Sequence, residues 1–97
     1  KKITDALKNE NYLRYLDQES FSNRAAYYMG EFNVIHPFRE GNGRSLRQFM
    51  SELAGQAGYF ILWENITQVQ MVQASIDAYN LSYELMTTLI RNNLQTF

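Results

Sequence analysis

The sequence predicts an all-α fold: a compact helical bundle of about five helices that forms a single domain over residues 1–97. One proline and five glycines leave few helix breaks. Apolar residues recur at spacings of three and four along almost the whole chain, which is the period of a helix with one buried face. With 45% apolar and 14% aromatic residues, the chain can form a packed core and is not expected to be disordered.

The first two helices are predicted from two apolar stripes. Ile3 and Leu7 begin an N-terminal helix, which is expected to falter around Asn9 and Asn11. The second stripe consists of Phe21, Ala25, Tyr28, Phe32 and Ile35. Because these residues lie three or four apart, they share one face of a long helix.

Polar residues and the proline set the bounds of this long helix. The Ser20 hydroxyl can cap its N-terminus. Pro37 disfavours α geometry in the residue before it, so we expect the helix to end near His36. Only the segment PFREGN then separates it from the third helix.

The third helix and a short connector follow. Its stripe is Leu46, Phe49, Met50, Leu53, Ala54 and Ala57. Gly58 is expected at the C′ position, where left-handed backbone favours glycine. The apolar segment YFILW, Tyr59 to Trp63, is a connector that suits extended backbone.

Two more helices complete the predicted bundle. One begins after Asn65 or Thr67, and the other is capped by Ser82. The stripe of the first is Val69, Val72, Ile76 and Tyr79. The stripe of the second is Leu85, Met86, Leu89, Ile90 and Leu94.

Charge and cysteine content exclude several classes of protein. Nine basic and ten acidic residues give a net charge of −1, which argues against a general nucleic-acid or membrane-surface binder. No apolar run approaches the length that spans a membrane. Without cysteine there is no disulfide, thiolate zinc site or cysteine nucleophile, which fits a reducing compartment such as the cytoplasm. Because the net charge is so small, any site that binds an anion must be a local cluster of basic residues.

The segment IHPFREGNGRSLRQF, residues 35–49, contains the features of such a local site. Gly41 and Gly43 let the backbone approach a ligand closely, and Asn42 supplies an amide. Arg44 and Arg47 lie three apart, so their guanidinium groups can reach the same anion from one helix face. Two arginines beside the free N–H groups of a helix N-terminus suit an oligophosphate.

Glu40 and His36 add catalytic chemistry to this phosphate site. A carboxylate beside phosphates repels them unless a cation intervenes, so Glu40 indicates magnesium (Mg2+). His36, at the end of the preceding helix, suits a general base that takes a proton from an attacking hydroxyl. Together these residues predict phosphoryl or nucleotidyl transfer. Phe38 is expected to be a structural anchor for the loop.

Each of these residues taken alone has a simpler explanation. A lone histidine at a helix end commonly interacts with the last carbonyls, and Glu40 alone would be a solvated loop charge. Arg44 and Arg47 alone would form a solvated helix face. Their occurrence together within a dozen residues favours the site over these explanations.

The motif resembles the signature of Fic-domain proteins, His-x-Phe-x-(Asp/Glu)-Gly-Asn-Gly-Arg-x-x-Arg. All eight specified positions are filled, by His36, Phe38, Glu40, Gly41, Asn42, Gly43, Arg44 and Arg47. The flanking segments also resemble the two central helices and the connector of bacterial Fic cores. Fic proteins are mostly adenylyltransferases that move AMP from ATP to a protein hydroxyl.

This resemblance implies a role for each motif residue. His36 would be the base for a target Ser, Thr or Tyr hydroxyl, and Glu40 the magnesium ligand. Asn42 and the backbone from Gly41 to Gly43 would hold the α-phosphate and its neighbour. Arg44 would bind the outer phosphates and Arg47 the γ-phosphate. Glycine at position 43 favours AMP transfer, because the kinase-like branch of the family carries lysine there.

Two features of the Fic family have no counterpart in the sequence. The β-hairpin flap that docks the target has no pattern between Lys1 and His36, so the chain is expected to be the C-terminal part of a Fic core and inactive by itself. The autoinhibitory pattern (Ser/Thr)-x-x-x-Glu-(Gly/Asn) is also absent. Inhibition would come from an upstream helix or an antitoxin-like partner that contacts Arg47.

Other interpretations stay open at this point. The chain could be a nucleotide-binding regulatory module without turnover, or a helical interaction module with a vestigial motif. Tyr79 and Asn80 are candidates for an adenine pocket, although a core tyrosine and a C-cap asparagine are the simpler interpretation. The protein would act in the bacterial cytoplasm, or in a host cytoplasm if it is a delivered effector.

Overall fold

The computed structural model describes residues 2–35 and 42–96. In this part of the chain the structure contains five α-helices, two short strands and two 3-10 turns. They are α1 (Lys2–Asn9), a turn (Asn11–Leu13), α2 (Gln18–Ile35), α3 (Asn42–Gln56), β1 (Tyr59–Ile61), a turn (Trp63–Asn65), α4 (Gln68–Tyr79), α5 (Glu84–Asn92) and β2 (Leu94–Thr96). The predicted all-α class is confirmed, with a small antiparallel sheet added to it.

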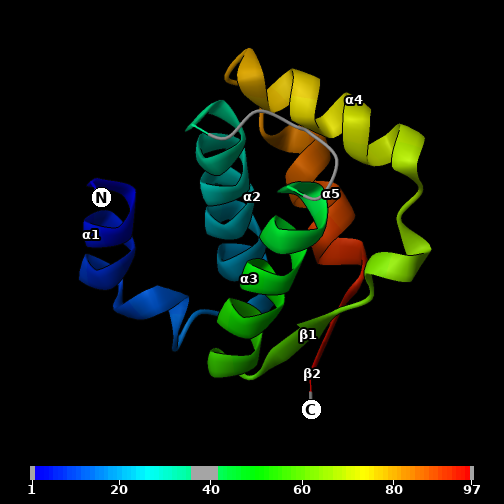
Figure 1. The fold of residues 1–97 in the computed structure, drawn as a ribbon. Coiled ribbons are helices and arrows are strands. Elements are labelled where there is room, and N and C mark those ends of the chain that lie inside the picture. Colours follow the sequence, from blue (N-terminus) through cyan, green and yellow to red (C-terminus); the bar gives the residue numbers. More distant parts are fainter. Residues whose placement is uncertain (1, 36–41, 97) are drawn as a thin grey trace.

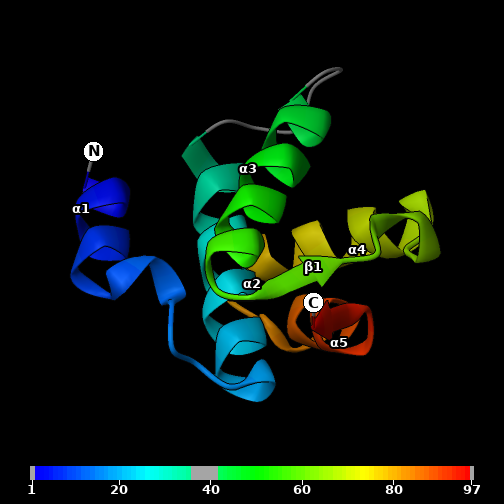
Figure 2. The same ribbon diagram turned by 90° about the horizontal axis from the view of Figure 1, so that it is seen from below.

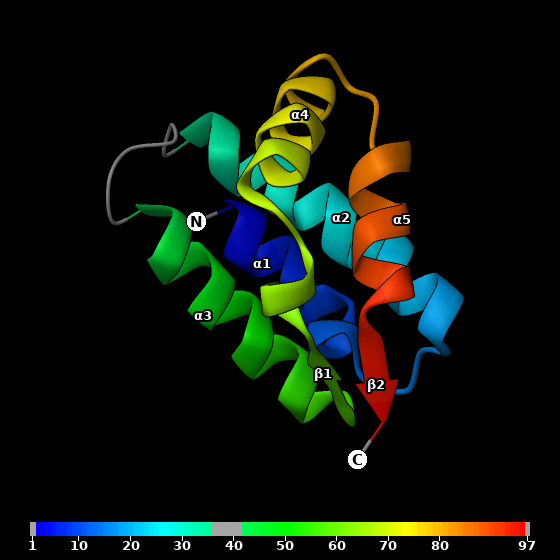
Figure 3. The same cartoon turned by 90° about the vertical axis from the view of Figure 1, so that its right-hand side faces the viewer.

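Helix α2 is the centre of the bundle, and each of the other four helices packs against it. Figure 1 shows α3 beside α2, with α4 across one end of the pair. The same arrangement seen from below and from the side shows α5 against α2 on the face away from α3 (Figures 2 and 3). The C-terminal end of α2 and the N-terminal end of α3 thus lie at the same end of the molecule, close to α4.

The core lies along the buried faces of α2, α3 and α5. The largest fully buried side chains are Tyr28, Phe21, Leu7, Leu13, Met50, Met86, Ile90 and Ser22. Three members of the predicted α2 stripe, Phe21, Ala25 and Tyr28, are buried as expected, and Phe32 packs against the core from its edge. The apolar spacing therefore identified the inner face of α2 correctly.

The cap of α2 differs from the prediction. The helix begins at Gln18, and the carboxylate of Asp17 accepts a hydrogen bond from the Ser20 backbone N–H at 2.7 Å. Ser20 is therefore inside the first turn and not the capping residue. The Ser20 N–H keeps the pKa of Asp17 below its usual value. A carboxylate at this position also interacts favourably with the helix dipole.

Helix α4 begins at one of the two predicted sites but presents a different face. Thr67 caps it, and Thr67 and Gln70 form a reciprocal capping box. The predicted core stripe of Val69, Val72, Ile76 and Tyr79 is exposed. The buried residues of α4 are Met71, Ala74 and Ala78. This part of the prediction is wrong, because α4 approaches Gly30 of α2 closely with the small Ala78 and so turns the predicted stripe to solvent.

The C-terminal segment is also partly corrected. The N-cap of α5 is Tyr83, without a side-chain cap, so the prediction for Ser82 is wrong. Leu94 is buried, as expected of a core residue, but it belongs to β2 and pairs with Ile61 of the antiparallel strand β1. The first three residues of the connector, Tyr59–Ile61, are therefore extended, whereas Trp63 begins a 3-10 turn. Gly58, which precedes β1, has φ +93°, the left-handed backbone predicted for the residue after α3.

A cluster of Glu10, Arg24 and Tyr28 attaches the segment after α1 to α2. Arg24 donates to Glu10 from Nε at 3.0 Å and from a terminal nitrogen at 2.6 Å, and the Tyr28 hydroxyl donates to the same carboxylate. The guanidinium also lies 4.8 Å from the ring centre of Tyr27. The hydrogen bond from Arg24 lowers the pKa of Glu10. The cluster thus holds Glu10 ionised beside a buried phenol.

This buried phenol predicts a loss of stability at high pH. Burial raises the pKa of Tyr28 from 10 to about 12. Because the unfolded chain ionises first, the stability that neutral Tyr28 contributes is complete below pH 10 and is lost as the pH rises towards 12. Urea unfolding across this range should show a steeper decline for the wild type than for Tyr28→Phe. The exposed Tyr15 provides the control, since Tyr15→Phe should follow the wild type. Identical curves for all three proteins would contradict the prediction.

Candidate functional site

The predicted site lies where α2 ends and α3 begins. Helix α2 runs to Ile35, so its end agrees with the predicted boundary at His36. Helix α3 starts at Asn42, which places Asn42, Gly43 and Arg44 in its first turn and Arg47 in the next. The four other predicted residues, His36, Phe38, Glu40 and Gly41, lie outside the described residues. The roles assigned to all eight residues stay predictions.

The start of α3 is positively charged and open. The Arg44 side chain is exposed and that of Arg47 is half-buried. Within residues 5–33 and 44–96, whose side chains are described, neither guanidinium has a hydrogen-bond or ion-pair partner. The backbone N–H groups of a first helical turn also lack partners within the helix. These donors together can bind the oxygens of a polyphosphate.

Aromatic and aliphatic contacts hold this end of α3 against α2. The rings of Phe32 on α2 and Phe49 on α3 meet edge to face, with centroids 5.3 Å apart and planes at 71°. Leu46, between the two arginines in the sequence, packs against the core. An edge-to-face pair has a preferred geometry, so it fixes the relative position of two helices better than aliphatic contact alone. The predicted phosphate-binding residues of α3 and the last turns of α2 therefore belong to one packed unit.

The last turns of α2 also contact α4 and Tyr83, and sequence reasoning did not identify these residues. Gly30 lies against Tyr83 and Ala78, and Asn33 donates a hydrogen bond to Ser75. The available signal was the isolated glycine inside the stripe of α2, since a glycine within a helix commonly marks a close approach. No local sequence pattern predicts the hydrogen bond between Asn33 and Ser75.

Tyr79 and Asn80, the two candidates for an adenine pocket, have different environments in the structure. Asn80 is the C-cap of α4, and its side-chain nitrogen donates to the Ile76 carbonyl at 3.2 Å. That simpler interpretation is confirmed. Tyr79 is 71% exposed, so its interpretation as a core residue is wrong. Nothing in the contacts of either residue indicates a nucleotide base.

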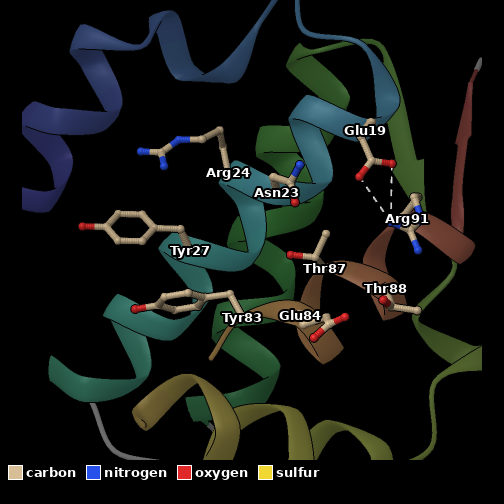
Figure 4. A pocket seen from close by; sticks show the side chains of 9 residues that line it. All are labelled: Glu19, Asn23, Arg24, Tyr27, Tyr83, Glu84, Thr87, Thr88 and Arg91. Atoms are coloured by element: carbon tan, nitrogen blue, oxygen red, sulfur yellow. Dashed lines mark hydrogen bonds and ion pairs between the residues drawn. The ribbon is translucent and has the colours of Figure 1, made fainter. Parts of the chain in front are cut away.

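A pocket of about 490 Å³ lies away from the motif, between the first half of α2 and α5 (Figure 4). Its wall includes Arg24, Tyr27, Tyr83, Thr87 and Arg91. Both arginines already have carboxylate partners, because Arg24 binds Glu10 and Arg91 lies 3.3 Å from Glu19. The pocket therefore offers no unpaired positive charge for phosphates, in contrast to the start of α3.

The described residues lack two further features, a cluster of metal-binding side chains and a membrane-spanning helix. Residues 2–35 and 42–96 contain no group of three or more histidine, cysteine, aspartate or glutamate side chains that could hold a metal ion. None of the helices in the same ranges combines the length and the apolar character needed to cross a bilayer. The predicted metal ligand, Glu40, lies outside these ranges.

Comparison with known proteins agrees with the motif. Residues 2–54 match the Fic/DOC family. The protein adenylyltransferase VbhT of Bartonella schoenbuchensis is 53% identical over 95 residues, which are 98% of this chain and 20% of that protein. The chain thus spans about a fifth of the length of this curated relative.

Solved structures show the same fold. The N-terminal Fic domain of a VirB-translocated Bep effector protein from Bartonella quintana, with bound ADP, has a TM-score of 0.91 and 35% identity, covering 98% of this chain and 45% of that one. The BepC protein of Bartonella tribocorum, with bound AMPPNP, has a TM-score of 0.90 and 31% identity, covering 99% of this chain and 46% of that one. The chain belongs to the Fic/DOC family.

Proposed function

We propose that the full-length protein transfers AMP from ATP to a Ser, Thr or Tyr hydroxyl of a target protein, and that this chain is the C-terminal part of its Fic core. One observation carries the proposal: all eight motif positions are filled in a chain that shares its fold with a relative solved with bound AMPPNP. A relative named as a protein adenylyltransferase is 53% identical over nearly the whole chain.

The proposed roles follow the positions of the residues along the chain. Arg44 and Arg47, on one side of the start of α3, bind the β- and γ-phosphates, and the N–H groups of the first turn help to hold the α-phosphate. Asn42 and the backbone of Gly41 and Gly43 complete this anion hole. Phe38 anchors the loop.

The reaction moves one proton and one nucleotidyl group. The imidazole of His36 takes the proton from the target hydroxyl, whose oxygen then attacks the α-phosphorus of ATP. The bond from the α-phosphorus to the bridging oxygen breaks, and pyrophosphate leaves with that oxygen. The guanidinium groups of Arg44 and Arg47 stabilise the charge that develops on pyrophosphate.

Glu40 is the proposed residue for Mg2+. A carboxylate and phosphate oxygens are the hard oxygen ligands that this ion prefers, so the donor chemistry fits. When bound, Mg2+ neutralises phosphate charge and orients the nucleotide. Solved relatives with ADP and AMPPNP support the nucleotide part of this proposal.

Target docking and inhibition are proposed to depend on other segments. A β-hairpin flap would pair with the target backbone as an added strand. The described residues between Lys2 and Ile35 form helices and a 3-10 turn, without a strand. An upstream helix or an antitoxin-like protein that contacts Arg47 would block the γ-phosphate. We place the activity in the bacterial cytoplasm or in that of a host, the latter because solved relatives are VirB-translocated effectors.

The experiment that tests the function compares two labels in ATP. The full-length protein is incubated with a cell lysate and either α-labelled or γ-labelled ATP. We expect labelling that depends on the added protein with the α-label only, because the transferred group contains the α-phosphorus and glycine stands at position 43. Lysate without the protein gives the background from its own kinases, and γ-label above that background would indicate a kinase. Nucleotide binding without transfer of either label would indicate a regulatory module instead.

A further inference from the structure

The last turns of α2, residues 30–33, are held on α4 and on Tyr83. A Cβ atom built on Gly30 would lie 2.7 Å from the Tyr83 ring and 3.0 Å from the Ala78 Cβ, both closer than normal contact. Only glycine allows this approach. The Tyr83 ring in turn packs edge to face on Tyr27, with centroids 5.6 Å apart. The backbone of α2 therefore rests directly on the neighbouring elements.

A hydrogen bond one turn later fixes the same contact. The Asn33 side-chain nitrogen donates to the Ser75 hydroxyl at 3.3 Å, and both side chains are half-buried. Ser75 lies in the middle of α4. Asn33 is three residues before His36 in the sequence and belongs to the last turn of α2, which ends at Ile35. This contact therefore lies on the turn of α2 that leads into the motif.

The two sides of α2 thus have different partners at this end. Phe32 contacts α3, which carries the arginines, while Gly30 and Asn33 contact α4 and the segment before α5. Arg44 and Arg47 themselves belong to α3 and not to α4. A change in the contact with α4 should therefore displace the end of α2 more than it displaces the phosphate-binding turn.

We infer that Ser75, through its hydrogen bond to Asn33, is a positioning residue for the proposed base His36. The inference rests on the proposed function. A positioned general base acts only in the transition state, so its misplacement lowers kcat without weakening the binding of ATP. Small misplacements are costly in such reactions: an error of about 1 Å can cost about 100-fold in rate.

The test compares two Ser→Ala variants of the full-length protein. Ser75→Ala is expected to lower kcat about 3- to 30-fold, with KM for ATP changed less than about twofold. Ser51→Ala is the matched control, because Ser51 accepts a hydrogen bond from the Trp63 indole at 2.7 Å and is also half-buried on a helix. That variant should lose similar stability but keep kcat. Thermal unfolding of both variants checks that each is folded.

A double-mutant cycle adds a second readout. Asn33→Ala removes the same hydrogen bond from the other side, so the double variant should have a kcat no lower than that of the more impaired single variant. Independent losses that multiply would overturn the inference. A normal kcat in Ser75→Ala, together with loss of transfer in His36→Ala, would also overturn the inference. That result would leave the proposed function intact. Full transfer by His36→Ala would overturn both.

Discussion

His36→Ala in the full-length protein is expected to lower AMP transfer by a factor of about 100 to 10,000, the usual contribution of a positioned general base. The target hydroxyl would then have to lose its proton to water. Binding of ATP should be nearly unchanged, because the proposed phosphate donors belong to the start of α3 and His36 precedes the loop. Transfer is measured with α-labelled ATP and binding by calorimetry.

A variant of the proposed phosphate site should instead lose affinity for ATP. Arg44→Ala removes charged hydrogen bonds worth about 1.5–3 kcal/mol each, so ATP affinity should fall about 10- to 100-fold. Arg14→Ala is the control for loss of one positive charge, since Arg14 is exposed and donates only to the Asn11 carbonyl among the described residues.

Equal transfer by His36→Ala and wild type would contradict the role of His36. Unchanged ATP affinity in Arg44→Ala would contradict the phosphate site.

The sequence predicted the parts of this site that depend on neighbours along the chain. Pro37 and the helical stripe that ends at Ile35 predicted the end of α2, and α3 begins at Asn42, the last residue of the predicted loop. Helix bounds follow from local backbone chemistry, and the motif is contiguous. The class of chemistry could therefore be inferred before any tertiary contact was known.

Contacts between distant segments were not predictable in the same way. The stripe of Val69, Val72, Ile76 and Tyr79 has the spacing of a core face, yet it is exposed. Ala74 and Ala78 are buried instead. The spacing rule ranks faces by apolar bulk, whereas the close approach of α4 to Gly30 requires a small side chain, and Ala78 supplies it. Asn33 and Ser75 are 42 residues apart, so only the tertiary structure brings them together.

The cap of α2 shows a smaller limit of the same kind. Asp17 and Ser20 are both residue types that favour N-caps, and the apolar stripe begins directly after Ser20. The helix nevertheless starts one turn earlier, at Gln18, because the Asp17 carboxylate reaches the Ser20 N–H. The apolar spacing therefore identified the buried face of the helix. The hydrogen bond to Asp17 makes the helix begin before the first residue of the apolar stripe.

The close approach at Gly30 predicts opposite effects for the same substitution at two helical glycines. Replacing glycine by alanine within a helix normally stabilises a protein by about 0.5–1 kcal/mol. Gly55→Ala on α3 should follow this rule, because nothing lies within 4 Å of its added Cβ. Gly30→Ala should instead destabilise the chain by about 1–3 kcal/mol, the usual cost of overpacking, because the new methyl group would meet Tyr83 and Ala78.

Urea unfolding of the 97-residue chain and the two variants measures both effects as changes in the free energy of unfolding. The two values should differ in sign, and the slope of the transition should stay the same. Gly30→Ala/Tyr83→Ala separates the two contacts, since removing the ring leaves only the 3.0 Å contact with Ala78. This pair should be less than additive, because the ring no longer resists the added methyl group. A gain in stability for Gly30→Ala equal to that of Gly55→Ala would show that α4 and Tyr83 yield freely, and such a contact could not hold the end of α2 in place.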